Sequence, residues 1–416
     1  MKRALLFFFS LLLACNIFAQ KETKSTFGFE LSGFVKTDAI LDSRQTISAR
    51  DGHFLLYPAA ENLDINGSDI NAKPNFNMLS IQTRLTGLIT GPDAFGAKSS
   101  GLIEGSFFGS VNSDINGFRL RHAYLQLDWK NSALLVGQYW HPMFMIELCP
   151  SVLSFNSGVP FQPFSRNPQI KFTQKLSSFY LSLTAASQLD FASYGPYGVN
   201  SSYLRNSVVP ILNFTAKYVN PAMILGVSTT YMTLTPRIFS SDDYNSATPQ
   251  KFSTNNSVSG ISAMGFVKFI IDEFVVKFEG IYGANVSDLL MLGGYAVKSV
   301  NASTGAEEYT NAKTLSVWTD FSYGKVLELG IFVGYTKNLG TDANNIGTYY
   351  SRGSDIQNVF RVSPRIKYKM GNVKFGAEVE YTSAAYGTPN NNSKGKVENS
   401  TSVANLRLLL AAYLFF

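Results

Sequence analysis

The sequence predicts an all-β protein, a transmembrane antiparallel β-barrel, and three observations support this. Hydrophobic residues make up 45% of the chain and charged residues only 15%, whereas an ordinary soluble domain has about 25% charged residues. After residue 19 no apolar run approaches the roughly 20 residues of a membrane-spanning helix. Glycine and aromatic residues are abundant, with 33 Gly, 33 Phe and 21 Tyr. This combination is typical of strands in which only every second residue meets lipid.

The N-terminus has the pattern of a secretory signal peptide. Two cations precede an apolar run at residues 4–14, which is too short to cross a bilayer. We therefore predict a signal peptide over 1–19, with cleavage after Ala19, and one barrel domain over 20–416. The segment LLAC, which ends at Cys15, leaves a second interpretation open, in which that cysteine is lipidated and becomes the N-terminus.

Alternating polarity identifies the strands. The clearest case is 373–382, where Val, Phe, Ala, Val and Tyr alternate with Lys, Glu and Thr. Candidate strands begin near residues 26, 77, 99, 117, 132, 167, 178, 208, 222, 257, 273, 312, 326, 356, 372 and 400. We therefore expect 16 strands, while the long link at 92–98 and the short loop at 112–116 leave 14 or 18 possible.

The links between these strands alternate in length. Short links such as 130–131, 220–221 and 371–372 alternate with long polar ones, at 44–76, 148–166, 191–207, 236–256, 286–311, 337–355 and 383–399. Short periplasmic turns and longer outer loops are how outer-membrane barrels are built, so both termini should lie on the short-turn side. A soluble sandwich of two sheets would also alternate, but aromatic residues near strand ends favour a membrane barrel.

The chain ends on an apolar strand, NLRLLLAAYLFF. Leu406, Leu410 and Phe416 share one parity, whereas Asn405 and Arg407 share the other. This predicts a last strand that faces lipid and closes the barrel. A terminal Phe on such a strand resembles the signal that the outer-membrane assembly machinery recognises, which makes that machinery an expected partner.

One long link differs from the others. Residues 149–164 are too apolar for an exposed loop and too rich in proline for a strand. They form the third outer loop, which we expect to fold inward as a constriction and to place Arg166 at the channel. The alternative is that this loop packs on the barrel top or on a neighbouring subunit.

The interior of a barrel with sixteen strands is too wide for wall side chains to fill, so the default is an aqueous channel. We expect basic side chains to line it and to attract anions or carboxylates. The pore-lining candidates are Lys36, Arg84, Arg119, Arg121, Lys171, Arg361, Arg365 and Lys367, together with Arg166. The strand that begins near residue 356 carries three of these cations as a column on one face, namely Arg361, Arg365 and Lys367. A plain wet wall, or contact with lipopolysaccharide at the rim, would explain the same residues.

Several strings resemble the DcaP-like outer-membrane porins. They are GFVKTDAILD (33–42), SIQTRLTG (80–87), GFRLRHAYLQL (117–127), LLVGQYW (134–140) and RNPQIKFT (166–173), with the final Phe416. The resemblance implies a trimer of sixteen-stranded barrels that takes up small carboxylates such as dicarboxylates. It supports Arg84, Arg119, Arg121 and Lys171 best, because they lie within matching strings.

Other functions have weaker signals. A hydrolase would need a His paired with a carboxylate or Ser; His53 lies in the first long loop, His122 on the outward parity, and His141 at the top of its strand. Trp318, on the inward parity, leaves a saccharide channel open, and a hydrophobic-substrate or structural barrel is a further alternative. The mature net charge of about 6 − 2 = +4 does not indicate a nucleic-acid partner.

Bound metal or cofactor is not expected. The segments 63–71 and 113–117 have oxygen side chains at alternate positions, as calcium loops do, but lack the Gly and Glu of the helical calcium loop. Turns built on Asn and Asp explain them as well, and loop calcium stays a minor alternative.

Overall fold

Sixteen spanning strands form a closed antiparallel barrel in the part of the chain described by the computed structural model, residues 27–109, 112–242 and 250–416. The predicted signal peptide and Cys15 lie outside the described residues. The spanning strands are β1 (Gly28–Asp42), β4 (Asn75–Leu79) continued by β5 (Arg84–Thr90), β6 (Lys98–Ser106), β7 (Arg119–Asp128), β8 (Ser132–Trp140), β9 (Arg166–Leu176), β10 (Phe179–Ala186), β11 (Ile211–Val219), β12 (Met223–Leu234), β15 (Val258–Ile271), β16 (Phe274–Ala284), β18 (Glu307–Tyr323), β19 (Leu327–Thr341), β21 (Ile356–Met370), β22 (Val373–Asn390) and β23 (Lys396–Phe415). The predicted strand number is confirmed.

The barrel closes between its first and last strands. β1 pairs with β23 from Phe34 opposite Phe415 to Asp42 opposite Arg407. The backbone N–H of Gly33 donates to the carbonyl of Phe416 at 3.0 Å, and the N–H of Phe416 donates back at 3.2 Å. The last residue is therefore part of the seam, whereas its role as an assembly signal stays a prediction.

The outer face is apolar, as the parity predicts. Leu408, Leu410 and Leu414 are exposed on β23, while Asn405 and Arg407 on the other parity are buried. The described residues include no helix that is long and apolar enough to cross a membrane. Strands of this polarity, closed without an edge, satisfy every backbone group within the bilayer.

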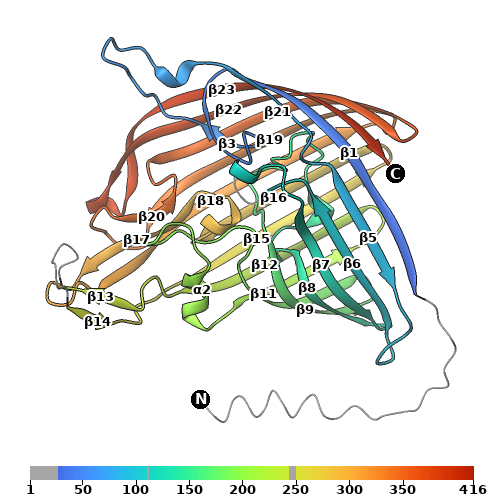
Figure 1. The fold of residues 1–416 in the computed structure, drawn as a ribbon, viewed down its shortest axis with the longest axis horizontal. Coiled ribbons are helices and arrows are strands. Elements are labelled where there is room, and N and C mark those ends of the chain that lie inside the picture. Colours follow the sequence, from blue (N-terminus) through green and yellow to red (C-terminus); the bar gives the residue numbers. More distant parts are fainter. Residues whose placement is uncertain (1–26, 110–111, 243–249) are drawn as a thin grey trace.

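Long connections gather at one end of the barrel and short turns at the other, where the C-terminus lies (Figure 1). The short turns depend on left-handed backbone, at Gly324 with φ 96° and Gly371 with φ 57°, which glycine adopts without steric cost. The long loops carry the remaining elements: β2 (Thr46–Ala49), β3 (Phe54–Pro58), β13 (Phe239–Ser241), β14 (Lys251–Ser253), β17 (Gly293–Val300), β20 (Tyr349–Arg352), the helix α2 (Ser202–Ser207), and the 3-10 turns η1 (Ile70–Ala72), η2 (Asn112–Asp114), η3 (Ile146–Leu148), η4 (Ser287–Leu289) and η5 (Asn391–Ser393).

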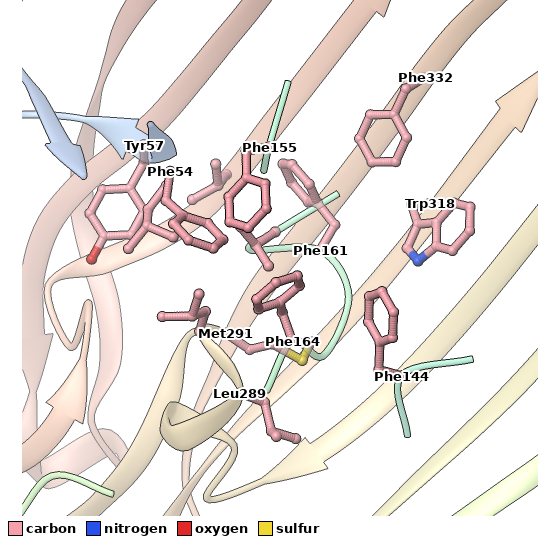
Figure 2. Close-up of a cluster of buried hydrophobic side chains, with 14 of the residues drawn as sticks. Phe54, Tyr57, Phe144, Phe155, Phe161, Phe164, Leu289, Met291, Trp318 and Phe332 are labelled. Carbon is pink, nitrogen blue, oxygen red and sulfur yellow. The ribbon is translucent and has the colours of Figure 1, made fainter. Parts of the chain in front are cut away.

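Three of these loops fold into the barrel and supply an apolar core there. We call them L1 (residues 43–74), L3 (141–165) and L6 (285–306). Figure 2 shows their side chains packed together, with Phe54 and Tyr57 from L1, Phe144, Phe155, Phe161 and Phe164 from L3, and Leu289 and Met291 from L6 against Trp318 and Phe332 of the wall. The third loop folds inward as predicted. The sequence did not predict that the first and sixth loops would join it.

Candidate functional site: the barrel lumen and its arginine cluster

Charged side chains of the wall hold L3 in the lumen. Glu378 on β22 accepts hydrogen bonds from the backbone N–H groups of Leu153 and Ser154. Further along the same arc of the wall, Lys277 on β16 donates to the carbonyl of Cys149 at 2.6 Å. Buried ions are costly unless hydrogen bonds satisfy them, and here the loop backbone supplies those bonds. These wall charges therefore stabilise the loop and are not open to the lumen.

Further contacts hold the middle and the second half of L3. Its Ser151 N–H donates to Asp320 of β18 at 3.0 Å, and its Phe161 carbonyl accepts from Ser316 Oγ at 2.7 Å. Lys36 of β1 donates to the Leu153 carbonyl at 2.9 Å and lies 3.0 Å from Asp38. Lys36 thus faces inward, as predicted, but is fully buried beneath the loop.

The predicted basic column on β21 faces inward, but every member has a partner. Arg361 donates to the carbonyl of Val159 at 2.8 Å, and Arg365 donates to Asp320 at 2.7 Å. Lys367 lies 2.9 Å from Glu328. Because loop carbonyls and carboxylates take up these cations, the column does not form the exposed anion surface that the sequence suggested. Parity gives the direction of a side chain but not what covers it.

The arginines of β5, β7 and β9, in contrast, are brought together on another part of the wall. They form two groups around two carboxylates. The first, which we call the lower group, surrounds Glu104 of β6: Arg121 Nε donates to Glu104 at 2.6 Å, and Arg84 Nε lies 3.6 Å from it. Among the described residues, Nη1 of Arg121 is buried without a hydrogen-bond partner. An unpartnered buried donor favours an additional acceptor.

The second group, which we call the upper group, surrounds Asp190, in the loop after β10. Arg166 donates two bonds to one of its oxygens, at 2.8 and 2.6 Å, and Arg119 donates to the other. Arg50, from L1, lies 3.9 Å away. Burial alone would raise the pKa of Asp190, but the surrounding Arg166 and Arg119 hold that pKa below its ordinary value. The carboxylate is therefore ionised throughout the physiological range.

We call these five residues, Arg50, Arg84, Arg119, Arg121 and Arg166, the arginine cluster. With Glu104 and Asp190 as its two carboxylates, the cluster has a formal charge of 5 − 2 = +3 while His122 is neutral. Aromatic rings lie against it: the Arg166 guanidinium is 5.3 Å from the Trp140 ring centre. A cavity of about 700 Å³, lined by Arg50, Asp190, Phe191 and neighbouring residues, adjoins the upper group.

Lys171 does not belong to this cluster. It lies with Lys217, which pairs with Glu147 of L3. One residue of the upper group, Arg50, was not among the predicted site residues. It lies in a loop, where no periodicity indicates the direction of a side chain. The apolar residues that follow it in L1, Phe54 to Tyr57, were the available signal.

One of the histidines lies elsewhere than predicted. His122 was expected on the outward parity and is instead buried, with Nε2 3.8 Å from Glu104. The pairing of β6 with β7 shifts there, because Glu104 is opposite His122 while Gly105 is opposite Leu120. Such a bulge inserts one residue and reverses the parity that follows.

Trp318 lies inward as predicted, but it is buried against Phe332 and its Nε1 donates to Glu279 at 3.0 Å (Figure 2). Its ring face is not open to a sugar. In the possible calcium loop at 63–71, Asp64 accepts from the backbone of Asn66 at 2.8 Å and of Ser68 at 2.9 Å. The described residues contain no cluster of three His, Cys, Asp or Glu side chains suited to a metal ion.

The architecture defines a class: the chain is a porin-type barrel, a multi-pass protein of the Gram-negative outer membrane. No protein-family model matches the chain, and no curated protein is similar to it in sequence. Solved structures are similar in fold. The outer membrane channel DcaP of Acinetobacter baumannii has a TM-score of 0.68 at 16% identity, over 96% of this chain and 100% of that chain.

Two further barrels share the fold at lower similarity. An anion-selective porin from Comamonas acidovorans has a TM-score of 0.53 at 9% identity, covering 94% of this chain and 100% of that chain. A trimer form of OmpT from Vibrio cholerae has a TM-score of 0.52 at 12% identity, with the same coverage. At these identities the likeness concerns the fold, and function must be argued from the lumen.

Proposed function

We propose that the protein is an outer-membrane porin through which small anionic solutes, such as carboxylates, diffuse passively, and that it is not an enzyme. The observation that carries this proposal is the excess of arginine over carboxylate in the arginine cluster. Guanidinium groups bind carboxylates in a planar, bidentate manner. A positive group on a low-dielectric wall also raises the local concentration of anions.

The similar structures agree with the proposed porin function, but the proposal does not depend on them. Two of the similar barrels are an outer membrane channel and an anion-selective porin. One is a trimer form, and we propose a homotrimer here as well. Dicarboxylate preference is the narrower expectation from the family resemblance.

The test is electrical. Purified protein in a planar bilayer under a KCl gradient should give a reversal potential on the anion side. The double variant Arg50→Gln/Arg119→Gln, which leaves Arg166 to balance Asp190, should move that potential towards zero. Arg205→Gln in α2, an exposed arginine bonded to Ser201, is the matched control and should change nothing. A wild-type potential on the cation side would contradict the proposal.

A further inference from the structure

L1 divides into two arms with opposite environments. The inner arm, which we call the finger (residues 46–58), contains the hairpin of β2 and β3, and its Phe54, Leu55 and Leu56 are at most 1% exposed. The outer arm (residues 59–74) projects away from the barrel (Figure 1), and its Ile65 is 99% exposed. An exposed loop would not bury consecutive apolar residues, so the finger is built to stay inside.

The barrel wall holds the finger from several strands. His53 Nε2 lies 2.9 Å from Asp38 of β1, and Arg407 of β23 donates to the Gly52 carbonyl at 2.9 Å. Arg361 of β21 donates to the carbonyls of Leu55 at 3.0 Å and Leu56 at 3.2 Å. One of these charges, Arg361, is among the residues that the sequence assigned to the pore lining.

The finger and L3 also hold each other. The Leu55 N–H donates to Asn156 Oδ1 at 2.6 Å. The Phe54 ring lies 4.6 Å from Phe155 and 5.2 Å from Phe164 between centres, edge to face in both cases. Aromatic pairs in this geometry contribute beyond their buried area. The two loops therefore occupy the lumen as one packed body.

The finger also places a member of the arginine cluster. Arg50, Asp51 and Gly52 are consecutive residues with positive φ, at 56°, 53° and 85°. Non-glycine residues adopt this region rarely, and runs of them are found where the surroundings enforce it. Here the turn sets the Arg50 guanidinium beside Asp190 and 5.8 Å from the Phe191 ring.

From these contacts we propose that the finger of L1, together with L3, sets the bore of the channel, and that its Arg50 is a specificity-determining residue for anions. The second half rests on the proposed function, whereas the first does not. An apolar constriction of this kind blocks ions by excluding water. Removing the finger takes away no strand pairing of the wall, because β2 and β3 pair only with each other among the described strands.

The experiment compares deletions in the two arms. In the first variant two glycines replace residues 47–57, whose flanking Thr46 and Pro58 are paired. In the matched control two glycines replace residues 63–69 of the outer arm, whose ends meet in a bridge between Leu63 and Asp69. Folding of both is checked by heat-modifiable gel migration, and single-channel conductance is measured in planar bilayers.

Finger deletion should raise the conductance roughly twofold or more, while deletion in the outer arm should leave it unchanged. Arg50→Gln alone should keep the conductance and lower the anion preference. Phe54→Glu, which puts a charge among apolar rings, serves if the deletion does not fold, and should also raise the conductance. Equal conductance in wild type and finger variants would overturn the proposal. If finger deletion raises the conductance but the wild-type channel shows no preference for anions, the proposed function is rejected, whereas the role of the finger in setting the bore is retained.

Discussion

His53 Nε2 lies 2.9 Å from Asp38 Oδ2, and neither side chain is exposed. The contact joins an outer loop to the first strand of the wall deep inside the barrel. Burial lowers the pKa of His53 below its ordinary value, and Lys36 and Arg407 lower it further, while Asp38 opposes the shift. The docked finger therefore favours neutral imidazole.

This linkage predicts a pH-dependent bore. A withdrawn finger would expose His53 to water, where its pKa would be about 6.5. The docked state binds fewer protons than the withdrawn state, so it loses stability as pH falls below about 6.5. Conductance should be higher at about pH 5 than at about pH 8, and His53→Gln should reduce the difference.

The control for this prediction is another buried histidine. Burial lowers the pKa of His141 in L3 to about 3, so His141→Gln tests whether L3 contributes a response of its own. Identical pH profiles for wild type and His53→Gln would show that the histidine does not control the finger.

The sequence predicts the strands of the wall far better than the loops and contacts inside the lumen. Lipid imposes period-two alternation on every spanning strand, so the polarity of residues such as Leu410 and Arg407 shows directly whether they face lipid or the lumen. The contents of the lumen depend on contacts between distant residues: Arg361 reaches Leu55, 306 positions away. Loops have no periodicity, and the bulge beside Glu104 moves His122 from the predicted side. Four members of the arginine cluster could be predicted, namely Arg84, Arg119, Arg121 and Arg166, whereas Arg50 could not.

Removing Glu378 should loosen L3. Glu378→Ala leaves the N–H groups of Leu153 and Ser154 without their acceptor, at a cost of about 1–3 kcal/mol in the docking of the loop. Backbone amides around these residues should exchange hydrogen faster, measured by mass spectrometry on detergent-solubilised protein. Glu398→Ala is the control, because Glu398 is an exposed carboxylate bonded to Asn390. Equal protection of L3 in both variants would mean that Glu378 does not hold the loop.

Neutralising Asp190 should increase anion preference. Asp190→Asn raises the formal charge of the arginine cluster from +3 to +4, as 5 − 1. Because Arg166 and Arg119 keep the pKa of this carboxyl below its ordinary value, acidification should reproduce the effect only below that ordinary value of about 4. Reversal potentials of wild type and variant, taken at several pH values, measure both effects. Asp272→Asn in a short turn, where φ is 54°, should leave the potential unchanged.

A charge on the lipid face should destabilise the barrel according to its depth. Leu410 of β23 is 61% exposed and pairs with Ala39 of β1, well inside the apolar band. Leu410→Arg should cost about 2–4 kcal/mol in the free energy of unfolding. Three residues earlier the same strand carries Arg407 without this cost, because that side chain faces inward and meets Asp42 at 2.7 Å.

Leu327→Arg, next to the short turn after β18, provides the comparison at the membrane boundary. Its residue is 51% exposed, and a cation near the interface should cost only about 0–1 kcal/mol. Urea unfolding of barrels refolded in lipid vesicles measures both values by linear extrapolation. If the two substitutions cost the same, Leu410 does not lie near the bilayer centre, and the assignment of the outward parity of β23 to lipid would have to be revised.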